Sequence, residues 1–164
     1  MITLVTGGAR SGKTRQALRN AGSKEPKTYI ATAELLDEEM RLRAARHRTE
    51  RGSLWITIEE PYAVAEHLRA LQGVVVIDCL TLWLSNWLLH AEAEVEHEIE
   101  NLCSSFRNTS ADVIAITNEV GSSVVPENAV ARSFRDYSGL MNQKVAEVAD
   151  RVFFMVCGLP LQVK

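Results

Sequence analysis

The stretch Gly7-Gly8-Ala9-Arg10-Ser11-Gly12-Lys13-Thr14 constrains the fold more than any other part of the chain. It satisfies the pattern G-x-x-x-x-G-K-[ST] of a phosphate-binding loop, and it lies between an apolar run at 2–6 and a segment of helical composition at 15–21. A strand before and a helix after are the context that this motif requires. The alternative is a glycine-rich turn that carries a lysine by coincidence, and the complete motif with both flanks disfavours it.

The chemistry of such a loop follows from its residue types. Small residues from Gly7 to Gly12 let successive backbone N–H groups converge on phosphate oxygens. A helix that opens at Gly12 adds the positive end of its dipole. Lys13 can reach the β- and γ-phosphates, and the Thr14 hydroxyl can bind Mg²⁺. Residues 7–14 are therefore predicted to bind a nucleotide, with Lys13 as a catalytic residue and Thr14 as a metal ligand.

Length and composition predict one domain over residues 1–164. The net charge of −3 gives no basic field for nucleic acid. Three distant cysteines without a C-x-x-C pair indicate neither a zinc site nor disulfides, so we expect thiols in a reducing cytoplasm. No signal peptide is evident at the N-terminus. The longest apolar run, Leu80–Leu89, is too short to span a bilayer, and we expect no membrane insertion.

Apolar runs of strand composition alternate with segments of helical composition. Strands are expected at 2–6, 28–32, 54–58, 74–77, 113–117 and 152–156, with 161–163 pairing beside the last. Helices are expected at 12–21, 37–51, 61–72, 80–101, with a broken or unbroken continuation to 106, and 126–150. This order predicts an α/β fold with a mainly parallel sheet flanked by helices. Ligands then bind at the carboxyl ends of the strands, where Ala33-Glu34, Glu59-Glu60, Asp78-Cys79 and Asn118-Glu119 would join the phosphate loop.

Asp78 directly follows a continuous apolar strand. An acidic residue at this place is the second half of a phosphate-loop site, where it holds Mg²⁺ directly or through water. It could instead cap the helix that starts at Leu80. Given the phosphate loop, we favour the metal role for Asp78. Glu59 and Glu119 also follow strands, and each could contact a ligand, cap a helix or pair with an arginine.

His47 lies in an arginine-rich helical segment. Arg43, His47 and Arg51 share one helix face because they are spaced four residues apart. Neighbouring arginines disfavour the imidazolium, and a neutral imidazole near a triphosphate is a competent nucleophile at phosphorus. The pattern alone nevertheless favours a solvated, charged helix with an incidental histidine.

Another helix, at 80–89, is apolar on nearly every side and carries Trp83 and Trp87. Such a helix is either fully buried or covered by another subunit. Asn142, on the last long helix, is an anchor at the site or a solvated residue.

A series of motifs in order resembles one known family. They are 6–14, Tyr29–Ala33, Asp37-x-Glu39-Met40, His47-Arg48-x-x-Arg51, Trp55-x-Thr57-x-Glu59-Glu60-Pro61, Asp78-Cys79-Leu80-Thr81-x-Trp83, Thr117–Gly121, Val125–Asn128, Phe134–Asp136, Asn142-Gln143 and Gly158–Pro160. The chain resembles the bifunctional adenosylcobinamide kinase / adenosylcobinamide-phosphate guanylyltransferase family of cobalamin synthesis. The likeness covers most of the chain and is weak only around 85–112. Thr14 stands where serine is commoner, which keeps the hydroxyl.

The resemblance implies a RecA-like subunit, a homotrimer and two reactions. A triphosphate, ATP or GTP, phosphorylates the corrinoid substrate, and GTP then donates GMP to that phosphate with release of pyrophosphate. It also implies that His47 carries the GMP, which reverses the inference from the pattern alone, and that Asp78 matches an acidic position of the family. The implied nucleotide contacts are residues 7–14, Thr32, Ala33, Glu34, Arg48, Thr49, Glu50, Arg51 and Glu59.

Two other functions compete with this one. A small-molecule kinase of the phosphate-loop type would use the same loop and leave His47 structural. A nucleotide-dependent switch or assembly ATPase would need a guanine-reading N-K-x-D segment or an obvious partner surface. Asn118-Glu119 is not N-K-x-D, which weakens the switch.

Overall fold

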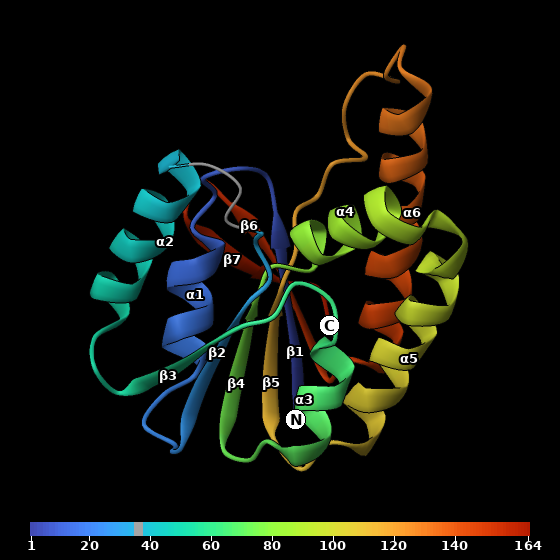
Figure 1. The fold of residues 1–164 in the computed structure, drawn as a ribbon. Coiled ribbons are helices and arrows are strands. Elements are labelled where there is room, and N and C mark those ends of the chain that lie inside the picture. The colour runs from blue at the N-terminus through green and yellow to red at the C-terminus, as the bar shows by residue number, and fades with distance from the viewer. Residues whose placement is uncertain (35–37) are drawn as a thin grey trace.

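A seven-stranded sheet forms the centre of the molecule, and helices cover both of its faces (Figure 1). The computed structural model describes residues 1–34 and 38–164, and of the side chains of residues 38–51 it describes those at 38, 41, 42, 45, 48, 49 and 51. The strands are β1 (Ile2–Gly7), β2 (Lys27–Ala31), β3 (Trp55–Glu59), β4 (Val74–Asp78), β5 (Asp112–Ile116), β6 (Arg151–Val156) and β7 (Leu159–Gln162). The helices are α1 (Lys13–Asn20), α2 (Glu38–Arg51), α3 (Val64–Ala70), α4 (Leu80–Ala91), the short 3-10 helix η1 (Glu92–Glu94), α5 (Val95–Asn108) and α6 (Ala129–Val148).

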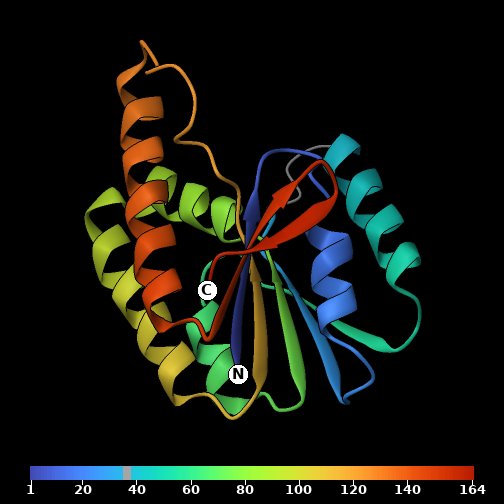
Figure 2. The same ribbon diagram turned by 180° about the vertical axis from the view of Figure 1, so that it is seen from behind.

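The strand order is β3-β2-β4-β5-β1-β6-β7. All neighbouring pairs are parallel except β6 and β7, which form an antiparallel hairpin at one edge (Figure 2). β1 lies between β5 and β6, so the loop that follows it leaves the sheet near its middle. This arrangement confirms the predicted α/β fold with a mainly parallel sheet.

Two apolar layers hold the sheet. Helices α1 and α2 lie on one face, and α3 to α6 lie on the other (Figure 1). The larger buried cluster, on the face of α3 to α6, includes Leu4, Trp83, Phe106 and Met141. The smaller cluster includes Val5, Ala17 and Val76 and lies under α1. Residues 4 and 5 point to opposite faces, as the alternation of side chains along a strand requires.

The apolar helix at 80–89 is buried within the chain itself. Leu80, Trp83, Leu84 and Leu88 of α4 are at most 8 % exposed, and of its large apolar side chains only Leu82, at 37 %, and Leu89, at 76 %, are exposed. Packing against the neighbouring helices therefore accounts for this segment, and no second subunit is needed to cover it. Within the described residues, no helix is long and apolar enough to cross a membrane.

Several predicted boundaries were wrong for local reasons. The helix expected from Pro61 begins only at Val64, because the Glu60 carboxylate accepts the backbone N–H groups of Tyr62 and Ala63 in a preceding turn. The helix expected over 80–101 is interrupted at 92–94, where three residues form a 3-10 turn, and α5 then continues past 106 to Asn108. The last helix begins at Ala129, where the Asn128 side chain caps it by accepting the N–H of Ala131, and not at Pro126. The expected cap at Asp37 lies outside the described residues.

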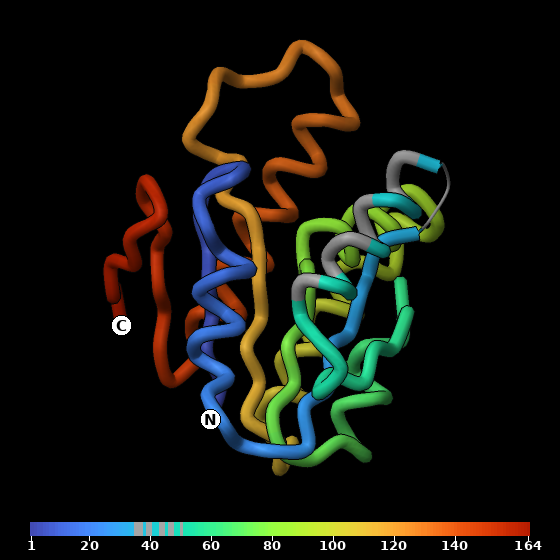
Figure 3. Tube along the Cα trace, turned by 90° about the vertical axis from the view of Figure 1, so that its left-hand side faces the viewer, coloured from blue at the N-terminus to red at the C-terminus, as the bar shows by residue number. Residues whose placement is uncertain are grey.

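The predicted ligand edge exists. The loops after β1, β2, β4 and β5 leave the same edge of the sheet, as parallel strands require. The segment between β5 and α6 extends beyond that edge on the side where residues 7–13 lie (Figure 3).

Candidate nucleotide site

The phosphate-binding loop connects β1 directly to α1. The two glycines that the motif specifies have positive φ angles, 146° at Gly7 and 94° at Gly12, which favour glycine over other residues. A Cβ at Gly7 would also lie 2.7 Å from the carbonyl oxygen of Met155. The hydroxyl of Ser11 is buried in the loop without a hydrogen-bond partner among the described residues, so it is available to a ligand oxygen.

Lys13 lies at the first position of α1 and is buried. Its ammonium donates to the carbonyl oxygens of Gly7 at 3.0 Å and Gly8 at 2.6 Å. Burial lowers the pKa of Lys13, while the nearby acidic groups of Cys79 and Asp78 act in the opposite direction. The ammonium is therefore held under the loop, within reach of any phosphate that the loop amides bind.

Asp78 ends β4 opposite the first turn of α1. Its Oδ2 accepts a hydrogen bond from the Thr14 hydroxyl at 3.2 Å and a second one from the hydroxyl of Tyr29. Burial, and then the adjacent Asp78 carboxylate, raise the pKa of Tyr29, so this phenol remains a donor at all ordinary pH values. The predicted pair of Thr14 and Asp78 is thus brought together, and Tyr29 joins it.

The donor set of this pair fits Mg²⁺. A hydroxyl and a carboxylate are hard oxygen ligands, and Mg²⁺ is usually held by one or two such groups together with water and substrate phosphates. Among the described residues no cluster of three or more His, Cys, Asp or Glu side chains could hold a metal by itself. Thr14 and Asp78 would therefore hold Mg²⁺ only together with the phosphates of a bound nucleotide.

The segment after β2 is fixed against the end of β4. The Thr32 hydroxyl donates to the carbonyl oxygen of Cys79 at 2.7 Å and accepts the N–H of Cys79 at 2.8 Å, and Thr32 is fully buried. Asn86 of α4 donates to the carbonyl oxygen of Thr32 at 2.8 Å. Ala33 and Glu34 are half-buried at the edge, where Glu34 accepts a hydrogen bond from the Tyr62 hydroxyl at 2.8 Å.

Cys79 is no candidate nucleophile. Burial, and to a lesser degree Asp78, raise the pKa of its thiol to about 11. The thiol is therefore protonated near neutral pH, and thiolate is the reactive form.

The loop after β5 is held by a buried polar network that the sequence prediction included only in part. The Thr81 hydroxyl accepts the N–H of Asn118 at 2.7 Å, and Thr117 donates to Asn142 at 2.9 Å. Asn142 in turn donates to the carbonyl oxygen of Asn118 at 3.2 Å. Asn142 thus anchors the loop after β5. The N–H of Glu119 donates to the carbonyl oxygen of Gly7 at 3.1 Å, which places this loop against the phosphate loop.

The end of α2 packs on the outer strands β2 and β3. Arg48 pairs with Glu59 at 2.5 Å, and Arg51 donates to the Thr57 hydroxyl at 3.2 Å. The guanidinium of Arg51 also lies 3.5 Å from the centre of the Tyr29 ring. The described hydrogen bonds and ion pairs that connect α2 to other elements go to β3. The side chains of His47, Glu50 and Arg43 lie outside the described residues.

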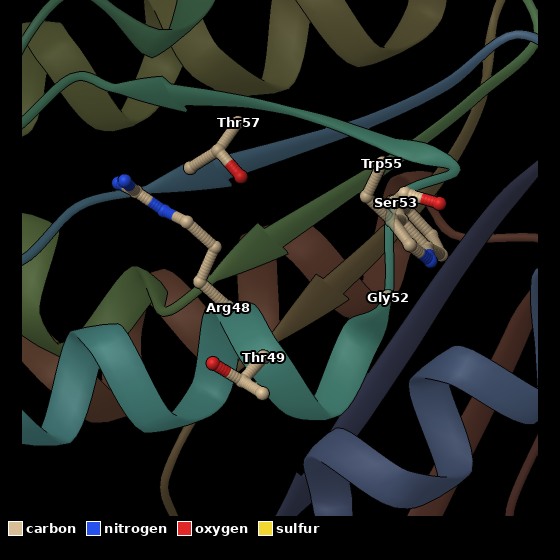
Figure 4. Close-up of a pocket in the computed structure, with 6 residues that line it drawn as sticks. All are labelled: Arg48, Thr49, Gly52, Ser53, Trp55 and Thr57. Carbon is tan, nitrogen blue, oxygen red and sulfur yellow. The ribbon is translucent and has the colours of Figure 1, made fainter.

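A cavity of about 600 Å³ opens between the second half of α2 and β3 (Figure 4). Its lining residues are Arg48, Thr49, Gly52, Ser53, Trp55 and Thr57. It begins beside Trp55, the first residue of β3, and so lies toward the end of the sheet opposite the phosphate loop. Arg48 and Thr49 are the predicted nucleotide contacts that border it.

Tyr29 is the residue of the site that the sequence prediction missed as a functional residue. The signal was its place in the middle of a buried strand, because a buried tyrosine hydroxyl nearly always has a hydrogen-bond partner. The sequence alone does not identify this partner as Asp78, which lies 49 positions away.

Solved structures with little sequence identity share the fold. A KaiC-like protein from Pyrococcus horikoshii aligns with 93 % of this chain and 69 % of its own at a TM-score of 0.50 and 15 % identity. An ATPase of a bacterial type III secretion system aligns with 98 % of this chain and 56 % of its own at a TM-score of 0.55 and 12 % identity. Together with the loop geometry, these likenesses identify a P-loop NTPase fold.

Sequence comparisons go further than the fold. The family model described as "Cobinamide kinase / cobinamide phosphate guanyltransferase" matches residues 3–163. A protein of Pseudomonas aeruginosa named bifunctional adenosylcobalamin biosynthesis protein CobP is 41 % identical over all of this chain and 98 % of its own, and the CobU protein of Escherichia coli K12, of the same description, is 36 % identical over the full length of both. A family model that matches nearly the whole chain, together with full-length relatives at 36–41 % identity, shows that this chain belongs to the cobinamide kinase / cobinamide phosphate guanyltransferase family.

Proposed function

We propose that this protein is a bifunctional enzyme of adenosylcobalamin biosynthesis. It phosphorylates adenosylcobinamide with ATP or GTP, and it then transfers GMP from GTP to adenosylcobinamide phosphate. The observation that carries the proposal is the assembly of Lys13, Thr14 and Asp78 around one phosphate loop in a chain that matches the family over residues 3–163. The description of the matching family model joins both activities, and the full-length relatives are named bifunctional, which disfavours a kinase without guanylyltransferase activity.

In the first reaction the substrate hydroxyl oxygen attacks the γ-phosphorus of the triphosphate. The bond from that phosphorus to the bridging oxygen breaks, the nucleoside diphosphate leaves, and the hydroxyl proton passes to solvent. The amides of residues 7–12 and the Lys13 ammonium stabilise the charge on the phosphates. Thr14 and Asp78 would hold a Mg²⁺ ion, which would neutralise further charge on the phosphate oxygens.

In the second reaction His47 is the carrier of the GMP group. An imidazole nitrogen attacks the α-phosphorus of GTP, a P–N bond forms, and pyrophosphate leaves. The phosphate oxygen of the corrinoid then attacks the same phosphorus, and the P–N bond breaks. The covalent intermediate divides one difficult transfer into two easier displacements.

Nucleotide contacts outside the loop are proposed at Thr32, Ala33 and Glu34, at residues 48–51 and at Glu59. The position of 32–34 at the ligand edge beside Asp78 supports the first group. The second group is supported by the cationic Arg48 and Arg51 at the end of the helix that carries residue 47.

Mass measurement of the intact protein after incubation with GTP tests the carrier role. We expect the wild type to gain the mass of one guanylyl group, and His47→Ala to gain none. His97→Ala removes an exposed histidine of α5 and should load like the wild type. Equal loading of the wild type and His47→Ala would remove the role of His47.

We further propose a cytoplasmic homotrimer. Its assembly is supported by exposed apolar side chains at the β6–β7 edge, namely Leu159, Leu161 and Val163, which are 59–71 % exposed. A reducing compartment is consistent with three free cysteines, of which Cys157 is exposed.

A further inference from the structure

Tyr29 contacts both halves of the proposed site. It is the middle residue of β2, which lies between β3 and β4 in the sheet (Figure 1). Its hydroxyl donates a hydrogen bond to Asp78 of β4, which lies beside the phosphate loop. Its ring contacts the guanidinium of Arg51, the last residue of α2. Among the hydrogen bonds, ion pairs and ring contacts of the described residues, those of Tyr29 alone join Asp78 to α2.

The hydroxyl fixes the Asp78 carboxylate. The hydrogen bonds that the described residues donate to this carboxylate, from Tyr29 and from Thr14, both end on Oδ2. Two donors on one oxygen restrict the rotation of the carboxylate, and Oδ1 accepts no hydrogen bond among the described residues. A phenylalanine at position 29 would fill the same space and lose this restraint.

The ring fixes the end of α2. The Arg51 guanidinium lies 3.5 Å from the ring centre, and its Nε is buried with no hydrogen-bond acceptor among the described residues. The face of the ring and the Thr57 hydroxyl are therefore the described partners of this half-buried cation. Trp55 also restrains the Tyr29 ring, because the two rings pack edge-to-face with 6.1 Å between their centroids.

Position 47 precedes Arg51 by one helical turn. Any shift of the last turn of α2 on the Tyr29 ring moves the backbone at residue 47 with it. We infer that Tyr29 is a positioning residue for the proposed reactions, whose hydroxyl orients Asp78 beside Thr14 and whose ring sets the position of the helix that carries His47. This inference rests on the proposed function for its consequence in catalysis, but its two contacts can be tested without turnover.

The hydroxyl is tested by Tyr29→Phe, with Tyr137→Phe as the matched control. Tyr137 is half-buried on α6, and its hydroxyl makes no hydrogen bond among the described residues, so both variants lose one phenolic oxygen. GTP affinity is measured by calorimetry with Mg²⁺ and with EDTA. Mg²⁺ is expected to raise the GTP affinity of Tyr29→Phe by a factor roughly tenfold smaller than that of the wild type, because a hydrogen bond to a charged group is lost. The GTP affinity measured in EDTA should be the same in both proteins. Tyr137→Phe should retain the wild-type gain.

The ring contact is tested from its other partner by Arg51→Gln, with Arg41→Gln as the control. Arg41 lies on the same helix, and its side chain is 60 % exposed. Hydrogen exchange of the nucleotide-free protein should show the amides of the last turn of α2 exchanging at least about fivefold faster in Arg51→Gln than in the wild type. Arg41→Gln and Tyr29→Phe should exchange at the wild-type rate in that turn, because both keep the stacked pair.

Turnover then tests the consequence of the hydroxyl contact for catalysis. In the presence of Mg²⁺, Tyr29→Phe should slow both the kinase reaction and the loading of GMP through kcat, and the KM for GTP should rise in line with the lost magnesium-dependent affinity. The inference is overturned if Tyr29→Phe keeps the full magnesium-dependent gain in affinity, or if Arg51→Gln leaves the exchange of α2 unchanged. If the wild type forms no GMP adduct, the proposed function fails, and the calorimetry and exchange results still decide the role of Tyr29.

Discussion

Single residues decide whether the phosphate loop can form at all. Gly7 combines a positive φ with a Met155 carbonyl oxygen that leaves no room for a methyl group. Lys13 stays beneath the loop because its two nearest acceptors are the carbonyl oxygens of Gly7 and Gly8. The geometry that would bind phosphates is therefore present in the loop itself, and it depends on residues that tolerate little change.

Gly7→Ala should lower the free energy of unfolding by about 2–4 kcal/mol, because backbone strain and a steric clash add. Chemical denaturation measures this change. The matched control is Gly139→Ala, in the middle of α6 with open space around its Cβ, which should be neutral or stabilising by up to ~1 kcal/mol. Equal effects of the two substitutions would show that the loop conformation described here is wrong.

At the scale of elements, side chains at the ends of strands and helices hold the site loops. Glu60 illustrates this at the entry to α3, where its carboxylate accepts two backbone N–H groups at 2.9 Å and lies 3.2 Å from His67. Burial alone would raise the pKa of Glu60, but the hydrogen bonds from Tyr62 and Ala63, together with His67, outweigh it and lower the pKa below its usual 4.5. The ionised form is therefore favoured by folding.

Glu60→Ala should lower the free energy of unfolding at pH 7 by about 1 kcal/mol. Because the folded pKa is depressed, this contribution is complete above the unfolded pKa near 4.5 and is lost as the pH falls through the lower folded value. Denaturation curves from pH 7 to pH 3 should show the gap between wild type and variant closing below about pH 4.5. A gap that stays constant over that range would contradict the role of the ionised carboxylate, and Glu147→Ala, at an exposed position of α6, is the control.

At the scale of the whole molecule, the sequence predicted the sheet and the ligand edge, because each strand is a short apolar run that ends in polar residues. It also predicted that Asp78 would join Thr14, since the carboxyl ends of parallel strands meet. It did not predict where α3 begins or that η1 interrupts the long apolar helix, because local hydrogen bonds decide such boundaries. The contacts of Tyr29 with Asp78 and Arg51 depend on strand order, which no local pattern encodes.

The proposed trimer can be tested at the same scale. Leu161→Glu introduces a charge into the exposed apolar edge of β7 and should shift the mass measured by light scattering from trimer toward monomer. Gln162→Glu places the same charge on the next residue of the strand, whose side chain points the opposite way, and should leave the mass unchanged. A wild type that is monomeric at micromolar concentration would contradict the trimer.

The most direct test of the whole account is a chase of the GMP group. Protein is loaded with α-labelled GTP, freed of nucleotide and mixed with adenosylcobinamide phosphate. The account predicts that label leaves the protein and appears in adenosylcobinamide-GDP, at a rate that matches steady-state turnover, and that His47→Ala neither loads nor transfers. Label that stays on the protein, or product formed by His47→Ala at the wild-type rate, would contradict it.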